Sequence, residues 1–309
     1  MPNMSNPPNP IVPMVQEKGY VLLDGALATE AERHGADLND PLWSAKLLLE
    51  APHTLEAIND DYLRAGADVA TTATYQATFE GFAARGLDEG EANRLMRLAV
   101  NIARRACDRH GRGLVVASIG CYGAFLHDGS EYRGDYDLSR DQLMDFHRGR
   151  LEVLIDAAPD IVAFETIPSL VEAEAILALL NELPPVPAWI SFSCRNEIEV
   201  CHGEPFAECA GLAGESAQVI AVGVNCTPPH YISALLGSAA GATTKPLAAY
   251  PNSGEGWDAA RHEWLPYEES FSIVDHVIEW HDLGARLIGG CCRTTPETIR
   301  AIAATLESS

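Results

Sequence analysis

The sequence predicts a parallel eight-stranded β/α barrel, and three observations lead to this fold class. Short runs of β-branched and apolar residues alternate with longer amphipathic stretches, and eight such runs occur along the chain. The runs are continuously apolar, which is typical of parallel strands that are covered on both faces. The chain has 309 residues, enough for eight β/α units, since such a barrel typically takes about 250. A doubly wound open sheet is the alternative.

The predicted strands follow one another in chain order, each separated from the next by a helical or irregular segment. The eight runs are residues 20–24, 67–74, 113–120, 160–166, 187–193, 218–225, 246–250 and 285–290. Among the intervening helices, residues 91–109 and 169–182 show the spacing of apolar residues that one buried helix face requires. Residues 1–17 are rich in proline and asparagine and have no apolar period, so we expect a flexible tail. A single domain over residues 18–309 should follow it.

The charge balance and the cysteine usage limit the classes of function. Lysine and arginine number 21 against 44 acidic residues, which gives a net charge of -23 and disfavours nucleic acid or anionic lipid as a partner. No apolar run reaches the roughly 20 residues of a membrane helix, and the first residues do not resemble a signal peptide. We therefore expect a cytoplasmic protein whose eight cysteines fill the core, bind metal or act as nucleophiles.

Polar residues stand directly after several predicted strands. Asp24 closes the first run, Tyr75 follows the second, Glu165 lies at the end of the fourth and Asn225 closes the sixth. Active sites of β/α barrels collect at the carboxyl ends of the strands. We therefore expect these side chains to meet on one face of the barrel.

Three cysteines occupy the same kind of position. Cys226 follows the sixth run, and Cys291 and Cys292 follow the eighth. Only one strand separates these two strands in a barrel, and three thiolates that leave one position open are typical of a catalytic zinc site. The two glycines before the cysteine pair should let the chain turn tightly. The alternative is that the cysteines are small buried apolar residues; Cys121, after the third run, is a candidate neighbour of the site.

Seven stretches of the sequence resemble a known family, the homocysteine S-methyltransferases, and in particular its bacterial branch that uses S-methylmethionine. They occur in the family's order and extend from about residue 20 to the end of the chain. The stretches are LLDGALATE (22–30), DPLWSAKLL (40–48), TTATYQATFEGFAARGL (71–87), DGSEYRGDY (128–136), VGVNC (222–226), YPNSGE (250–255) and GGCCRTTP (289–296).

The resemblance implies a fold, a reaction and a metal. The family's (β/α)₈ barrel agrees with the strand count. The implied reaction moves a methyl group from a sulfonium donor, S-methylmethionine or S-adenosylmethionine, to the thiol of L-homocysteine and forms methionine. The implied cofactor is Zn²⁺, held by Cys226, Cys291 and Cys292.

The resemblance also implies roles for five further residues. Asp24 and Glu165 would hold the amino group of homocysteine, Trp43 and Tyr75 would lie near the substrates, and Asn225 would belong to the same substrate-binding set. The alternatives are a turn role for Asp24, a helix-capping role for Glu165 and a packing role for the two aromatic residues.

Other functions share parts of this pattern. Betaine-dependent methylation of homocysteine would use the same zinc site, but that branch usually carries a long C-terminal extension, whereas this chain ends shortly after Cys292. Cobalamin-dependent methionine synthesis would need further modules for which the chain has no room. A non-enzymatic zinc-binding or thiol-sensing barrel is the third alternative, and an open coordination position disfavours it.

Overall fold

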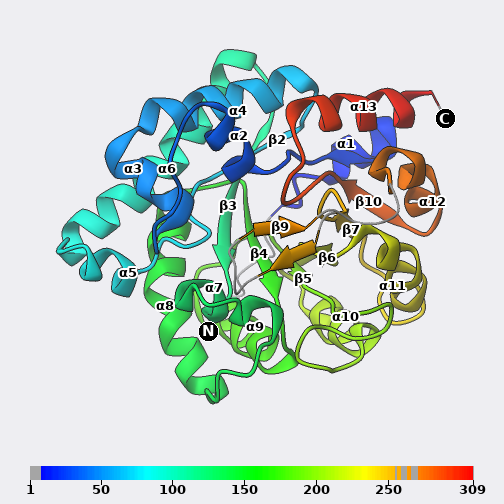
Figure 1. Ribbon diagram of the computed structural model, residues 1–309. Coiled ribbons are helices and arrows are strands. Elements are labelled where there is room, and N and C mark those ends of the chain that lie inside the picture. Colours follow the sequence, from blue (N-terminus) through cyan, green and yellow to red (C-terminus); the bar gives the residue numbers. More distant parts are fainter. Residues whose placement is uncertain (1–7, 255, 259–262, 266–270, 309) are drawn as a thin grey trace.

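A parallel eight-stranded sheet forms the centre of the molecule and helices surround it (Figure 1). This computed structural model describes residues 8–254, 256–258, 263–265 and 271–308. The strands run in the order β1-β10-β7-β6-β5-β4-β3-β2, and each predicted run coincides with one of them, with β4 extending one residue beyond its run. Their bounds are β1 (Val21–Leu22), β2 (Val69–Thr71), β3 (Leu114–Gly120), β4 (Ile161–Ile167), β5 (Ala188–Phe192), β6 (Val219–Asn225), β7 (Leu247–Tyr250) and β10 (Ala285–Ile288).

The first and last strands of this order, β1 and β2, lie against each other and close the sheet into a barrel. The backbone N–H of Asp68 donates to the carbonyl of Leu22 at 2.8 Å, and the N–H of Leu22 donates to the Asp68 carboxylate at 2.7 Å. Three residues further along the chain, at the end of β2, the N–H of Thr71 donates to the carboxylate of Asp24 at 2.8 Å. The predicted barrel is therefore confirmed, and the open-sheet alternative is wrong.

Helices cover the outside of the barrel, and the two predicted from periodicity are both present. The predicted helix at 91–109 is α6 (Glu89–His110), which begins after the capping box of Asp88 and Glu91 and ends at Gly111 in the left-handed conformation. The predicted helix at 169–182 is α9 (Leu170–Glu182). The other helices of six or more residues that follow α1 (Val12–Lys18) are α2 (Leu27–Arg33), α4 (Pro52–Ala65), α5 (Phe79–Ala84), α8 (Arg140–Asp156), α10 (Phe206–Glu215), α11 (Ile232–Ala239), α12 (Val277–Asp282) and α13 (Pro296–Glu307).

The predicted flexible tail needs correction over the residues that the structure describes. Helix α1 (Val12–Lys18) stands where the tail was expected. Ile11 is 1% exposed and packs with residues of the barrel interior, such as Val21 and Val69, and Lys18 forms an ion pair with Asp68 at the start of β2. This short helix therefore lies against the amino-terminal end of the barrel. Residues 1–7 lie outside the described residues.

Between β7 and α12 the chain forms an element that the sequence analysis did not predict. Strands β8 (Gly256–Asp258) and β9 (Glu263–Leu265) pair antiparallel as a small separate sheet. In the view of Figure 1 this pair, drawn in orange, projects onto the middle of the barrel. Because it follows β7, it belongs to the carboxyl-end face of the barrel, where the predicted site residues are.

As for membranes, none of the helices in the described ranges combines the length and the apolar character that a membrane span needs.

Candidate active site

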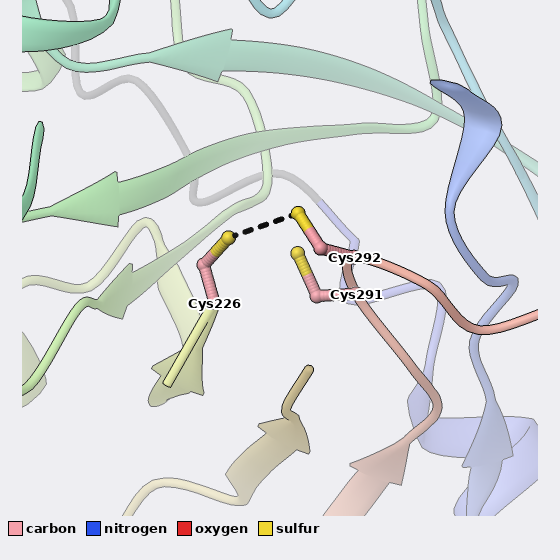
Figure 2. A group of neighbouring side chains, drawn as sticks. All are labelled: Cys226, Cys291 and Cys292. Atoms are coloured by element: carbon pink, nitrogen blue, oxygen red, sulfur yellow. Dashed lines mark hydrogen bonds between the residues drawn. The ribbon is translucent and has the colours of Figure 1, made fainter. Parts of the chain in front are cut away.

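The three predicted cysteines meet at the carboxyl end of the barrel. Cys226 directly follows β6, and Cys291 and Cys292 stand three and four residues beyond the end of β10. Their Sγ atoms all lie within 4.8 Å of one another, and the sulfurs of Cys226 and Cys292 are 3.5 Å apart (Figure 2). Two thiolates on one tetrahedral zinc ion would be about 3.8 Å apart, given Zn–S bonds of about 2.3 Å. The sulfur positions therefore fit a single metal ion.

Backbone hydrogen bonds between loops hold the thiols in this arrangement. The N–H of Cys291 donates to the carbonyl of Pro251 at 2.7 Å, and the carbonyl of Cys292 accepts from the N–H of Ser253 at 3.0 Å. The loop after β10 is thereby attached to the loop after β7. Cys226 itself has a φ of 49°, a left-handed conformation that is uncommon for a residue with a side chain.

The two glycines before the cysteine pair are needed for close packing. A Cβ atom at Gly289 would lie 2.6 Å from the Cβ of Leu23, and one at Gly290 would lie 2.4 Å from the Oγ1 of Thr294. Neither glycine has a left-handed φ, whereas Arg293, just after the pair, has a φ of 68°. Glycine is therefore needed at both positions because a side chain would clash, and at Gly290 the clash lies within the turn that the hydrogen bond from the Thr294 N–H to the Cys291 carbonyl closes.

A cavity of about 430 Å³ opens beside the thiols. All the candidate residues predicted from the sequence line it: Asp24, Trp43, Tyr75, Glu165, Asn225, Cys226, Cys291 and Cys292. Cys121, the candidate neighbour, is instead fully buried at the end of β3 and is not among the described residues that line the cavity.

Two carboxylates face this cavity, Asp24 just beyond β1 and Glu165 on β4. Asp24 accepts hydrogen bonds from the N–H of Thr71 at 2.8 Å and from its hydroxyl at 2.9 Å, while Glu165 accepts one from the hydroxyl of Ser118 at 2.5 Å. Burial raises the pKa of Asp24 to about 6 and that of Glu165 to about 7, and Asp24 itself contributes to the shift at Glu165. Such a pair would be stabilised in its charged form by a bound cation.

The two predicted aromatic residues lie together at the cavity. Trp43 begins the short 3₁₀ helix η1 (Trp43–Lys46), and Tyr75 follows β2. Their ring centroids are 6.0 Å apart at an interplanar angle of 68°, an edge-to-face contact. Aromatic faces attract cations without offering a competing nucleophile.

Asn225 has its amide engaged by neighbouring protein groups. Its carbonyl oxygen accepts from the N–H of Thr166 at 2.8 Å, and its amide nitrogen donates to the hydroxyl of Thr166 at 2.9 Å. The same nitrogen lies 3.8 Å from the Sγ of Cys291. These contacts indicate that Asn225 positions the Cys291 sulfur and donates toward it.

The cavity is also where the backbone departs most from ordinary conformations. Left-handed residues other than glycine occur at five of its lining positions: Trp43, His127, Thr166, Cys226 and Arg293. Each such residue costs of order 1 kcal/mol or more and persists because the surrounding structure holds it. Their concentration here is typical of a functional site.

Sequence reasoning missed two lining residues, Glu131 and Tyr132 in the 3₁₀ helix η2 (Ser130–Tyr132). The hydroxyl of Tyr132 lies 3.3 Å from the Sγ of Cys226. One carboxylate oxygen of Glu131 is buried and has no hydrogen-bond partner among the described residues. The signal that could have found them is the stretch DGSEYRGDY, which contributed to the resemblance and follows β3 at the site's end of the barrel.

Comparison with known proteins agrees with this geometry. A family model described as homocysteine S-methyltransferase matches residues 21–306. Homocysteine S-methyltransferase YbgG of Bacillus subtilis is 48% identical over 97% of this chain and 98% of its own. A selenocysteine Se-methyltransferase of Brassica oleracea is 47% identical over 92% of this chain and 88% of its own.

A solved structure shares the fold closely. The metallated form of the homocysteine methyltransferase MmuM from Escherichia coli is 43% identical and has a TM-score of 0.87, covering 96% of this chain and 99% of its own.

Proposed function

Because the chain belongs to the homocysteine S-methyltransferase family, we propose that it uses a zinc ion to transfer a methyl group from S-methylmethionine, or from S-adenosylmethionine, to L-homocysteine. The products are methionine and the demethylated donor. The observation that carries this proposal is the meeting of three thiols, two carboxylates and two aromatic rings on one cavity.

The donor set favours zinc as the metal, with Cys226, Cys291 and Cys292 as its ligands. Three cysteine sulfurs form a soft site, and among the residues that the structure describes no histidine or carboxylate belongs to this group of ligand atoms. When bound there with one position open, zinc would keep the thiol of homocysteine in its nucleophilic thiolate form. The amide of Asn225 and the hydroxyl of Tyr132, which lie next to the ligand sulfurs, would stabilise the charge of the thiolates.

Asp24 and Glu165 would receive the amino group of homocysteine. Both carboxylates line the cavity beside the thiols, and burial raises the pKa of each. An ammonium group placed between them would lower both pKa values, because its positive charge would balance the negative charge of the two carboxylates. This contact would fix the amino acid so that its side chain points toward the three sulfurs.

The sulfonium donor would bind against the rings of Trp43 and Tyr75. A free thiol with a pKa near 8.5 is about 3% thiolate at pH 7, so complete ionisation raises the reactive fraction only about 30-fold. Holding the donor methyl and the acceptor sulfur in line is worth about 7 to 11 kcal/mol. Alignment of the two substrates is therefore the larger contribution of the protein. The leaving thioether is neutral, so no general acid is required.

We expect methionine to form from homocysteine with S-methylmethionine or S-adenosylmethionine, and not with betaine. A chelator that removes the metal should abolish the reaction, and added zinc should restore it. The measurement is methionine formation with each of the three donors, before and after chelation. Undiminished activity in metal-free protein would contradict the proposed role of zinc, and activity with betaine alone would contradict the donor class.

Metal-free protein kept in air is expected to form a disulfide between Cys226 and Cys292, so that added zinc no longer restores activity until a reductant is supplied. Their sulfurs are already 3.5 Å apart, so a small movement would bring them to bonding distance. Thiol titration of chelated protein, kept with and without oxygen, should show two thiols lost in air and recovered with a reductant. If chelated protein kept every titratable thiol in air for hours, the two sulfurs would not be neighbours in solution.

A further inference from the structure

We propose that Glu131 binds the α-ammonium group of the methyl donor, and that the cavity therefore selects sulfonium donors that are themselves amino acids. This inference rests on the proposed function, because it assigns a residue to the donor of that reaction.

The surroundings of Glu131 leave its carboxylate in need of a cation. It lines the cavity, and its Oε2 atom is buried without a hydrogen-bond partner among the residues that the structure describes. A buried carboxylate oxygen that lacks a partner is costly. Arg133, on the same loop, is engaged elsewhere: it donates to Ser130 and pairs with Asp135. A ligand cation is the group that would complete this position.

Glu131 stands apart from the two carboxylates assigned to homocysteine. Asp24 and Glu165 interact with each other, and Glu165 is hydrogen-bonded to Ser118. Glu131 instead follows β3 and α7 (Tyr122–Leu126) and precedes Tyr132, whose hydroxyl contacts Cys226. One homocysteine brings one ammonium group to the cavity. Glu131 is a second anionic position, so it matches a second ammonium group. The other substrate of the reaction, the methyl donor, carries that group.

The donor carries two cationic groups, and the ammonium group is the better partner for Glu131 because its charge does not change during methyl transfer. The sulfonium loses its charge when the methyl group leaves, so an ion pair with it would stabilise the ground state more than the transition state and slow the reaction. The ammonium charge persists throughout. Its contact with a carboxylate can therefore fix the donor without raising the barrier.

The loop holds Glu131 at a defined place. Its carbonyl accepts from the hydroxyl of Ser193, just beyond β5, at 3.0 Å. Its backbone also packs so closely on α7 that a Cβ atom at Gly123 would lie 2.4 Å from the Glu131 nitrogen. At the far end of the loop, Tyr136 donates to the buried Glu172 of α9. The loop that carries this carboxylate is thus attached to three parts of the barrel, as a binding residue requires.

The test compares two donors on Glu131→Gln, which removes the charge and keeps the shape. One is S-methylmethionine and the other is 4-dimethylsulfoniobutanoate, its analogue without the amino group. With zinc-loaded protein and calorimetry, the variant should bind S-methylmethionine about 10- to 150-fold more weakly, as expected for loss of one charge-assisted hydrogen bond. Its affinity for the analogue should change less than about threefold. Glu131→Asp should lie between the variant and the wild type.

Asp137→Asn is the matched control, because Asp137 lies on the same segment before α8, is exposed and does not line the cavity, and asparagine tolerates its left-handed φ of 46°. It should bind both donors as the wild type does. Equal losses for both donors in Glu131→Gln, an unchanged affinity for S-methylmethionine, or a weakened affinity for homocysteine would each overturn the assignment. If the wild type itself failed to bind S-methylmethionine, the proposed donor class would be wrong. Failure of the proposed function can therefore be distinguished from failure of the assignment of Glu131.

Discussion

Cys291→Ala protein is expected to lose its metal and nearly all methyl transfer to homocysteine. Structural zinc sites with four ligands bind with roughly 10 to 16 kcal/mol, or about 2.5 to 4 kcal/mol for each ligand. Removing one of the three sulfurs should therefore weaken the binding of the metal by roughly 100- to 1,000-fold. The measurements are metal content after dialysis against a weak chelator and methionine formation with S-methylmethionine.

Cys107→Ala is the matched control for this variant. Cys107 is also buried, but it lies in α6, outside the group of neighbouring sulfurs. It should keep one zinc per chain and normal activity, with only a small loss of thermal stability. A Cys291→Ala protein that still held a full complement of zinc would show that Cys291 is not a ligand.

Glu165→Gln should weaken homocysteine binding by about 10- to 150-fold, because one charge-assisted hydrogen bond is worth about 1.5 to 3 kcal/mol. Zinc content should stay at one per chain, since no Glu165 oxygen belongs to the group of ligand atoms. The measurements are the affinity for homocysteine, the affinity for S-methylmethionine and the zinc content. Glu182→Gln, a half-exposed carboxylate on α9, is the control and should behave as the wild type. Loss of zinc from Glu165→Gln would assign the residue another role.

The same variant should change the pH dependence of binding. Burial raises the pKa of Glu165 to about 7, so in the ligand-free protein this group is charged at pH 8 and largely neutral at pH 5.5. Only the charged form attracts the ammonium group. The ratio of the variant's dissociation constant to that of the wild type should therefore be largest at pH 8 and approach one as the pH falls. A constant ratio across this range would contradict a charge-dependent role.

The sequence analysis was most successful where a single local rule determines the structure. Each predicted strand is present because a continuously apolar run can be buried only between two covering layers. The three cysteines were located correctly because parallel strands in a barrel end on one face. Both inferences need only the order of the elements along the chain. The ligand and substrate roles of these residues stay predictions.

The features that were missed depend on contacts between distant parts of the chain. Helix α1 has a proline-rich start. Two contacts hold it against the amino-terminal end of the barrel: Ile11 packs on the barrel interior and Lys18 pairs with Asp68. Glu131 is one of three acidic residues in the stretch DGSEYRGDY, and only the cavity shows which of the three lines the site. The close contact of Gly289 was not foreseen for the same reason, since its neighbour Leu23 lies far away in the sequence.

The hydrogen bonds of Asp24 have a consequence for mutational studies of this family. Its carboxylate accepts from Thr71 on β2, at the place where β1 and β2 complete the ring of strands. A substitution of Asp24 therefore affects both the closure of the barrel and the proposed binding of homocysteine. Asparagine would retain an oxygen for Thr71 and discard the charge, whereas alanine would discard both. Comparing these two substitutions therefore separates the loss of homocysteine affinity caused by the missing charge from the loss caused by the missing contact between β1 and β2. Glu165 accepts its hydrogen bond from a side chain and not from the backbone of a strand, so a substitution there reports on homocysteine recognition alone.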